Sequence, residues 1–288
     1  EHICKEAVVF HRNKDGTLIR ELRKKSGAFE SERKCYVQMG RIGDLILLLP
    51  AWKAIADRTG LNPVVVSSVE FGSVLTGVSY VEPVLLPFNW GGQLRQAVQF
   101  AQANYTNVVC TQLHGNGIAP IPDSLASYSL SMWERTGLLD EYASLPLVFD
   151  RRNSQRESVL VARYRHTKKP LLLYSNQGKT SPLHHDGGLF TSQLAKLESQ
   201  FEVVNIGTVT VRFVYDLLGL FDIAAGLVTI DTMHLHLAPA SKIPYIALVR
   251  DDGQSGSVPK GNCVLKVGYS SVPKSVSRIL ETIKSWAA

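Results

Sequence analysis

Two short segments of the chain hold residues whose types and spacing suit catalysis and phosphate binding. The first is Met39–Ala51, MGRIGDLILLLPA, in which Gly40 and Gly43 permit a tight turn and close approach of a ligand to the backbone. Asp44 follows this turn, where a helix is expected to begin. From the spacing alone its favoured role is to cap that helix, and its alternative role is that of a general base.

The second segment is Val228–Ala240, VTIDTMHLHLAPA, where a buried strand is expected to end at Asp231 and a short helix to follow. Asp231 and Thr232 can cap this helix, and its free N–H groups can hold phosphate oxygens. His236 can donate a hydrogen bond to a phosphate or a sugar hydroxyl, although such a histidine is more often a hydrogen-bonded core residue. His234 and His236 are two positions apart, which argues against one shared metal ion.

Both segments are expected at strand-to-helix turns, because short apolar strands alternate with longer helices along the chain. In the first half we predict strands at Cys35–Met39, Val64–Ser68, Val81–Leu86 and Asn107–Gln112, and helices at Asp44–Arg58 and Gln93–Asn104. In the second half we predict strands at Pro170–Ser175, Phe201–Ile206, Leu227–Asp231, Pro244–Val249 and Cys263–Val267, and helices at Thr191–Gln200, Val211–Leu220, Met233–Ser241 and Val272–Trp286. This alternation is typical of βαβ units and predicts an α/β chain with parallel sheets, whose ligands collect at the carboxyl ends of the strands.

The alternation weakens within Gly115–Arg156, which contains three prolines. This stretch is the best candidate for a connection between domains. A chain of 288 residues is long enough for two domains with separate cores. We therefore predict an N-terminal extension over residues 1–34, a Rossmann-like domain over 35–152 and a second one over 153–288.

The N-terminal extension is basic. Two strand-like runs, Ala7–His11 and Thr17–Leu22, flank an Asp-Gly pair, which is a hairpin signal. The chain has 31 Lys and Arg against 25 Asp and Glu, and Arg12–Lys34 alone carries eight basic and four acidic residues, which is +4 of the total +6. The favoured interpretation is a solvated edge hairpin, and the alternative is a contact surface for an anionic acceptor.

Targeting signals and metal motifs are missing from the sequence given. No apolar run approaches the roughly 18–20 residues that span a bilayer, and no signal peptide is visible, so we expect a cytoplasmic protein. The cysteines are scattered without C-x-x-C pairs or zinc-ligand spacing, which indicates small buried hydrophobic residues in a reducing compartment. They are Cys4, Cys35, Cys110 and Cys263.

The two segments together carry a family resemblance. Arg41–Asp44, RIGD, followed by an apolar helix with Leu49–Ala51, resembles the N-terminal signature of family nine glycosyltransferases, the bacterial heptosyltransferase family. Asp231–Ala240, D-T-x-x-x-H-L-A-x-A, followed by Pro244 and a strand, resembles the C-terminal signature of that family. The resemblance covers the chain from about Cys35 onward. It implies a GT-B architecture, with two Rossmann-like domains facing each other across a cleft.

The resemblance also implies an activity. The protein is expected to be an enzyme that transfers a sugar from a nucleotide-diphosphate sugar to an acceptor hydroxyl, with inversion and without a metal or other cofactor. Asp44 is then the catalytic base. Asp231, Thr232, Met233 and His236 are expected to hold the diphosphate and the sugar of the donor, although the family usually has glycine where Met233 stands.

Further site residues come from the resemblance and from positions at strand ends. The resemblance implies a lysine in the loop after the strand Pro170–Ser175, and Lys179 is the candidate there for a donor phosphate contact, with a solvated loop lysine as an equal alternative. Gly43 is expected on the acceptor side. Trp90, His114 and Asn116 follow predicted strands of the first half and are expected to contact the acceptor, with ordinary loop structure as the favoured alternative.

The acceptor and the donor sugar stay open. A glycan or a lipopolysaccharide core sugar fits the resemblance, and such an acceptor would bring the protein to a membrane surface. The basic extension also suits DNA phosphates, so a DNA-modifying glycosyltransferase acting on a flipped-out hydroxymethylated base is an alternative. A non-catalytic protein that binds nucleotide-sugars or nucleic acid is a second alternative, because Met233 departs from the family pattern.

Overall fold

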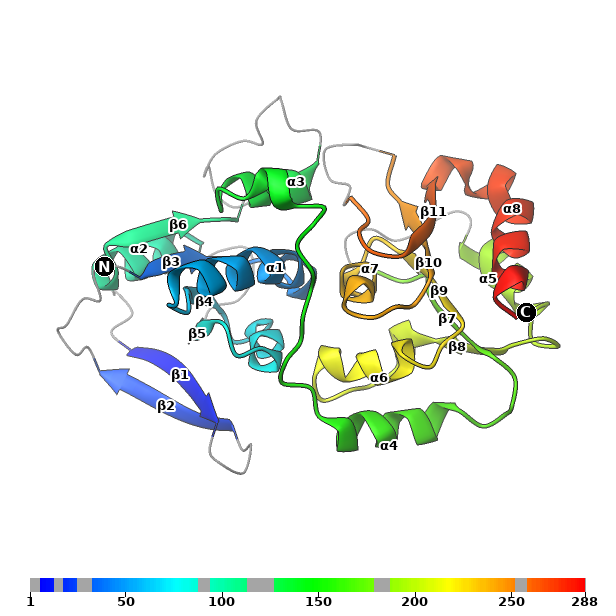
Figure 1. Ribbon diagram of the computed structural model, residues 1–288, viewed down its shortest axis with the longest axis horizontal. Coiled ribbons are helices and arrows are strands. Elements are labelled where there is room, and N and C mark those ends of the chain that lie inside the picture. The colour runs from blue at the N-terminus through cyan, green and yellow to red at the C-terminus, as the bar shows by residue number, and fades with distance from the viewer. Residues whose placement is uncertain are drawn as a thin grey trace. The chain divides into compact units, whose positions relative to one another are not determined.

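The chain consists of two compact units, Glu1–Arg151 and Arg152–Ala288 (Figure 1). The computed structural model describes residues 6–12, 18–24, 33–87, 94–112, 127–178, 187–251 and 258–287. Each unit is built on its own β-sheet. In these ranges no helix is long and apolar enough to span a membrane.

The first unit contains a six-stranded sheet with the strand order β2-β1-β5-β4-β3-β6. Its strands are β1 (Glu6–Arg12), β2 (Leu18–Lys24), β3 (Lys34–Val37), β4 (Val64–Ser68), β5 (Glu82–Leu86) and β6 (Asn107–Cys110). The four strands β5-β4-β3-β6 are parallel. The chain adds β4 and β5 on one side of β3 and then returns to place β6 on the other side. Ligands of such sheets bind beside this reversal, at the carboxyl ends of the strands.

Strands β1 and β2 form the N-terminal hairpin, as the Asp-Gly signal predicted. They pair antiparallel from Glu6 opposite Lys24 to Arg12 opposite Leu18. Strand β1 also pairs antiparallel with β5, with Val8 opposite Leu85. The hairpin therefore extends the parallel sheet at its β5 side and makes β2 the outer strand.

Helices cover both faces of the first sheet. They are α1 (Ile42–Thr59), α2 (Leu94–Asn104) and α3 (Tyr128–Glu134), with 3-10 helices η1 (Gly72–Gly77) and η2 (Leu139–Glu141). Helix α2 packs Phe100 on the face that carries Cys35 and Val37. Helix α1 lies on the opposite face, because Trp52 contacts Tyr36, with 6.2 Å between their ring centroids, and neighbouring strand residues alternate between faces.

The second unit contains a five-stranded parallel sheet with the order β11-β10-β9-β7-β8. Its strands are β7 (Leu171–Ser175), β8 (Glu202–Asn205), β9 (Gly226–Ile230), β10 (Tyr245–Val249) and β11 (Cys263–Gly268). Its helices are α4 (Ser154–Tyr164), α5 (Gly187–Ala195), α6 (Leu218–Phe221), α7 (Met233–Leu237) and α8 (Val272–Lys284), with 3-10 helices η3 (Ile206–Thr208), η4 (Val214–Leu217), η5 (Ala238–Ala240), η6 (Tyr269–Ser271) and η7 (Ser285–Ala287). The strand order reverses between β7 and β9.

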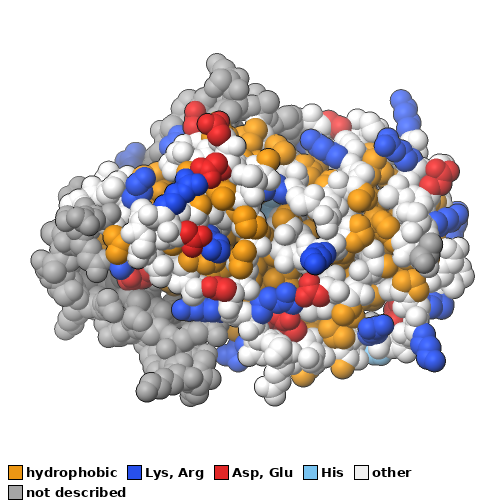
Figure 2. All heavy atoms as spheres, viewed as in Figure 1, with side chains coloured by type: hydrophobic (Ala, Val, Ile, Leu, Met, Phe, Trp, Pro, Cys, Tyr) orange, Lys and Arg blue, Asp and Glu red, His pale blue; other side chains and the backbone are white. Residues whose placement is uncertain are grey.

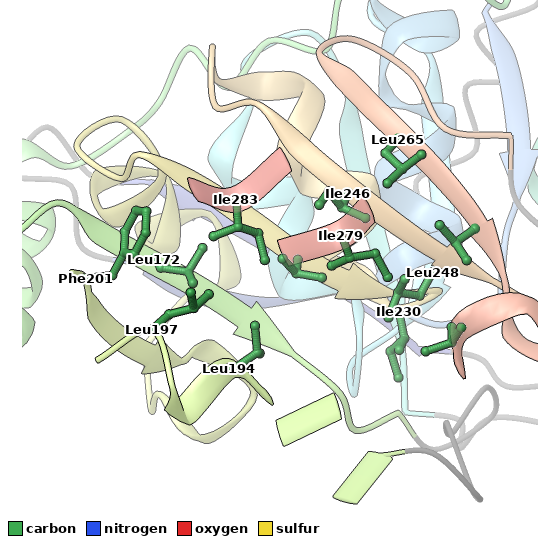
Figure 3. Close-up of a cluster of buried hydrophobic side chains, with 13 residues drawn as sticks. Leu172, Leu194, Leu197, Phe201, Ile230, Ile246, Leu248, Leu265, Ile279 and Ile283 are labelled. Carbon is green, nitrogen blue, oxygen red and sulfur yellow. The ribbon is translucent and has the colours of Figure 1, made fainter. Parts of the chain in front are cut away.

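The core of the second unit lies between the sheet, α5 and α8 (Figure 3). Ile279 and Ile283 are one helical turn apart on α8, and both are fully buried against the sheet. Leu194 and Leu197 belong to the same cluster. The buried side chains of the sheet in this cluster are Leu172, Val228, Ile230, Ile246, Leu248, Leu265 and Val267. This packing holds β7 and β9 in place and so fixes the edge where Asp231 stands.

The chain is held firmly on each side of the boundary between the units. In the first unit Asp150 accepts a hydrogen bond from the Ser79 N–H at 2.8 Å. In the second unit Arg152 donates to Glu157 at 2.6 Å and to Asp222 at 2.6 Å. These bonds attach residues 150 and 152 to different units.

Two predicted helices of the second unit and the expected connection need correction. Helix α5 spans Gly187–Ala195 and not Thr191–Gln200. The stretch that we expected to be a connection contains α3 and the start of α4. The predicted helix Val211–Leu220 is replaced by η4 and α6. Phe213 is extended, with φ −132° and ψ 139°, because its ring stacks on Tyr215 and lies under the Arg156 guanidinium. Periodicity alone does not reveal such a contact with α4.

Charged side chains of both signs are interspersed on the face of the molecule drawn in Figure 2, among the residues that are described. Several basic residues of the described chain are paired, such as Arg58 with Glu141 and Lys53 with Asp57. Exposed pairs of this kind contribute little to the free energy of unfolding.

Gly226 provides a test of how Trp286 of η7 packs against the second sheet. A Cβ atom at this position would lie 2.0 Å from Cε3 of Trp286. We expect Gly226→Ala to lower the free energy of unfolding by about 1–3 kcal/mol, because the ring must move. Urea unfolding followed by circular dichroism measures this loss.

The double variant Gly226→Ala/Trp286→Ala supplies the control. Without the Trp286 ring the added methyl group meets no obstacle, so the two losses should sum to more than the loss of the double variant. Simple additivity of the two losses would contradict the packing of Trp286 on Gly226.

Candidate functional site

The loop from β3 to α1 places Asp44 at the carboxyl end of the first sheet, beside the point where the strand order reverses. Helix α1 begins at Ile42, so Asp44 is its third residue. The Arg41 N–H donates a hydrogen bond to Asp44 Oδ2 at 2.8 Å, and the carboxylate is half-buried. The capping interaction expected from the spacing is therefore present, and it holds the carboxylate in one orientation.

Gly40 lies directly under this carboxylate. A Cβ atom on Gly40 would be 2.3 Å from Asp44 Oδ2 and 2.8 Å from Gln38 Oε1. The sequence predicted that Gly40 admits a ligand close to the backbone, whereas the group that approaches it is the chain's own carboxylate. Gly43 is half-buried in the first turn of α1, next to Asp44.

Tyr128, at the start of α3, is a site residue that sequence reasoning missed. Burial raises the pKa of its hydroxyl well above the usual range, and the nearby charges of Asp44 and Cys110 raise this pKa further. The hydroxyl therefore keeps its proton. The only sequence signal was a tyrosine that opens a short apolar run after a proline-containing stretch, and that signal is weak.

The second segment forms a strand-to-helix turn in the second unit. Strand β9 ends at Ile230, and Thr232 is the N-cap of α7. Thr232 Oγ1 accepts a hydrogen bond from the His234 N–H at 3.4 Å and lies 3.2 Å from His234 Nδ1. Met233, half-buried, is the first residue of the helix.

The two histidines of this turn differ in their burial and in their neighbours. His236 Nε2 lies 3.5 Å from Asp231 Oδ1, and the two side chains are 11% and 9% exposed. His234 is buried, which lowers its pKa to about 4. No group of three His, Cys, Asp or Glu residues suited to a metal ion occurs within the described ranges.

Polar groups also follow the neighbouring strands β10 and β11, and one of them, Tyr269, interacts with Asp231. Burial is the largest influence on the Tyr269 hydroxyl and raises its pKa, while a hydrogen bond with the Asp231 backbone and the charge of Arg250 act in the opposite direction. Asp251 accepts a hydrogen bond from the Ser270 N–H at 2.8 Å. Sequence reasoning missed these residues, although each directly follows a strand.

On the other side of the strand reversal, two buried polar atoms have no partner within the described part of the chain. Ser175 Oγ and Asn176 Oδ1 have no hydrogen-bond partner among the residues that the structure describes. Asn176 Nδ2 donates to Thr191 Oγ1 at 2.8 Å, which holds the amide in place. A buried polar atom without a partner is costly, so these two atoms are suited to a polar ligand at the end of β7.

Some of the predicted site residues lie within the described ranges, where they form two groups. Asp231, Thr232, Met233 and His236 lie together at the end of β9, and Gly43 and Asp44 lie together at the end of β3. The remaining predicted site residues lie outside the described residues. They are Lys179, Trp90, His114 and Asn116.

His234 gives the turn a defined pH dependence of stability. Its pKa is about 4 in the folded protein and about 6.5 when unfolded, so below pH 6.5 the unfolded chain takes up a proton that the folded chain does not. The free energy of unfolding should therefore fall by up to about 3 kcal/mol between pH 6.5 and pH 4 because of this group.

The variant His234→Gln should show a shallower fall over this range in urea unfolding at several pH values. His166→Gln, which changes an exposed histidine, is the matched control and should follow the wild type. Parallel curves for the wild type and His234→Gln would contradict the buried neutral state of His234.

Comparisons with known proteins find similar structures but no similar sequence. No protein-family model matches the chain, and no curated protein matches it in sequence. A glycosyltransferase of family 9 from Veillonella parvula is similar in structure, with a TM-score of 0.58 and 12% identity over 88% of this chain and 91% of that one.

The iron-containing dodecameric glycosyltransferase TibC from enterotoxigenic E. coli is also similar, with a TM-score of 0.51 and 12% identity over 85% of this chain and 73% of that one. A structure of the heptosyltransferase TibC in complex with ADP-D-beta-D-heptose gives a TM-score of 0.53 and 13% identity over 85% of this chain and 64% of that one. The chain therefore has the two-sheet α/β fold of family 9 glycosyltransferases, as its two motifs predicted.

Proposed function

We propose that this protein is a glycosyltransferase that moves a sugar from a nucleotide-diphosphate sugar to an acceptor hydroxyl, with inversion and without a metal ion. One observation carries the proposal: in a chain with this fold, the Asp44 carboxylate is held by the Arg41 N–H at the carboxyl edge of the first sheet. The expectation that Asp44 is the catalytic base rests on that placement.

In the proposed reaction Asp44 accepts the proton of the acceptor hydroxyl as its oxygen attacks the anomeric carbon of the donor. The new bond forms on the face opposite to the leaving diphosphate, and the bond between the anomeric carbon and the diphosphate oxygen breaks. Tyr128 keeps its proton, so it adds no negative charge to that of Asp44. Gly40 leaves the space that the carboxylate needs.

The donor is proposed to bind at the end of β9, through Asp231, Thr232, Met233 and His236. The contact with Asp231 orients the His236 imidazole, as carboxylates orient histidines at many sites. A diphosphate oxygen can accept a hydrogen bond from the second ring nitrogen in the imidazolium form, in which both nitrogens carry a proton. Lys179 is proposed to add positive charge for the leaving diphosphate, which takes the place of a metal ion in this mechanism.

The proposed acceptor is a hydroxyl of a glycan, such as a lipopolysaccharide core sugar. The proposal draws on the family resemblance and on the fold. A DNA acceptor and a purely binding function are the alternatives that the sequence left open. No contact among the described side chains favours either of them.

Replacing the base tests the proposed mechanism. The variant Asp44→Asn keeps an oxygen that can accept from the Arg41 N–H but cannot take up the proton. We expect kcat for sugar transfer to fall about 10²–10⁴-fold, with nucleotide affinity retained. Transfer is measured by release of the nucleoside diphosphate.

Asp57→Asn is the matched control, because Asp57 is on the same helix, is 61% exposed and pairs only at the surface with Lys53. It should leave kcat unchanged. Full activity of Asp44→Asn would remove Asp44 from the mechanism.

A panel of nucleotide-sugars tests the donor site. Because TibC was solved with an ADP-heptose, an ADP-sugar is the first candidate, compared with UDP-, GDP-, CMP- and dTDP-sugars. A ligand at 100 times its Kd stabilises the folded state by about 2.7 kcal/mol, which a rise in Tm reports.

The variant His236→Gln should reduce the rise in Tm caused by the best donor, whereas His166→Gln should not. A panel in which no nucleotide raises Tm would contradict the donor site, and an unchanged rise in His236→Gln would exclude His236 from it.

A further inference from the structure

Gln38 is a fully buried amide directly after β3. It follows three buried residues of β3 and is itself 0% exposed. Its N–H donates to the Val66 carbonyl oxygen at 2.9 Å, which continues the pairing with β4 by one residue. Burial of an amide is costly unless its polar atoms find partners, so the partners of this side chain indicate its role.

Both ends of the Gln38 side chain are engaged. Oε1 accepts a hydrogen bond from the Gly40 N–H at 3.0 Å, and Nε2 donates to Met132 Sδ on α3 at 3.3 Å. The Gly40 N–H needs an acceptor, which fixes the orientation of the amide. A thioether accepts weakly, so the bond to Gly40 is the stronger of the two.

The same turn holds Asp44. The N–H groups of the consecutive residues Gly40 and Arg41 are bound by two side chains, Gln38 before the turn and Asp44 after it. Both side-chain oxygens crowd the α-carbon of Gly40, where a Cβ would meet them at 2.8 Å and 2.3 Å. A change in the backbone at Gly40 must therefore move the Asp44 carboxylate.

We propose that Gln38 is a positioning residue for Asp44: it fixes the Gly40–Arg41 turn and thereby the orientation of the carboxylate. The proposal rests on the proposed role of Asp44 as the base. Gln38 acts through the backbone and not on the acceptor or the donor. Met132 supports it from α3 by holding the far end of the amide.

The activity test compares Gln38→Met with Met132→Leu. Gln38→Met keeps the volume and removes both hydrogen bonds, and we expect kcat to fall at least tenfold while KM for the donor changes less than twofold. Met132→Leu leaves the bond to Gly40 in place, so kcat should fall less than threefold. A purely structural role would instead lower the amount of folded enzyme and leave kcat per folded molecule unchanged, which would overturn the proposal.

A second measurement does not depend on activity. Hydrogen exchange followed by NMR should show the Gly40 and Arg41 amides at least 100-fold protected in the wild type and at least tenfold faster in Gln38→Met. Unprotected amides in the wild type would overturn the proposal, even if the variant fails to fold.

Asp44→Asn separates the two proposals. If it stays fully active, the base assignment fails, whatever Gln38→Met does. If it is inactive while Gln38→Met keeps both its kcat and the protection of the Arg41 amide, only the positioning role of Gln38 fails.

Discussion

The hydrogen bond from the Arg41 N–H to Asp44 is the interaction on which the candidate site of the first unit depends. It exists because β3 ends just before a turn that contains Gly40, the one residue type without a side chain to displace the carboxylate. The same bond opens α1, whose apolar residues cover the sheet. One contact thus joins the start of a helix, the packing of a sheet face and the orientation of a carboxylate.

In the second unit other residues hold the candidate site side chains at the edge of the sheet. Parallel strands bring their carboxyl ends to one edge, and the core under α8 holds that edge rigidly. Asp231, His236 and Tyr269 come from two strand ends and one short helix, yet they lie together. Their burial strengthens the contacts between them, because a low dielectric strengthens polar interactions.

Much of the fold was predictable from local patterns. The strands were found because each is a short apolar run between polar turns, and β4 was predicted with its observed bounds, Val64–Ser68. The hairpin followed from an Asp-Gly pair. The failures lie where distant contacts decide the backbone, as in the predicted helix Val211–Leu220, which is interrupted because Arg156 of α4 holds Phe213 in an extended conformation.

The sequence by itself determined the two strand-to-helix turns and the α/β class, because glycine, aspartate and apolar periodicity act over a few residues. It left open whether Asp44 caps a helix or faces a ligand. Only the tertiary structure decided that Met132 of α3 holds the Gln38 amide beside the turn and that the Asp44 charge acts on the buried Tyr128 hydroxyl. Helix α3 comes some ninety residues after β3 in the chain, so its residues reach this turn only when the sheet and its helices are packed together.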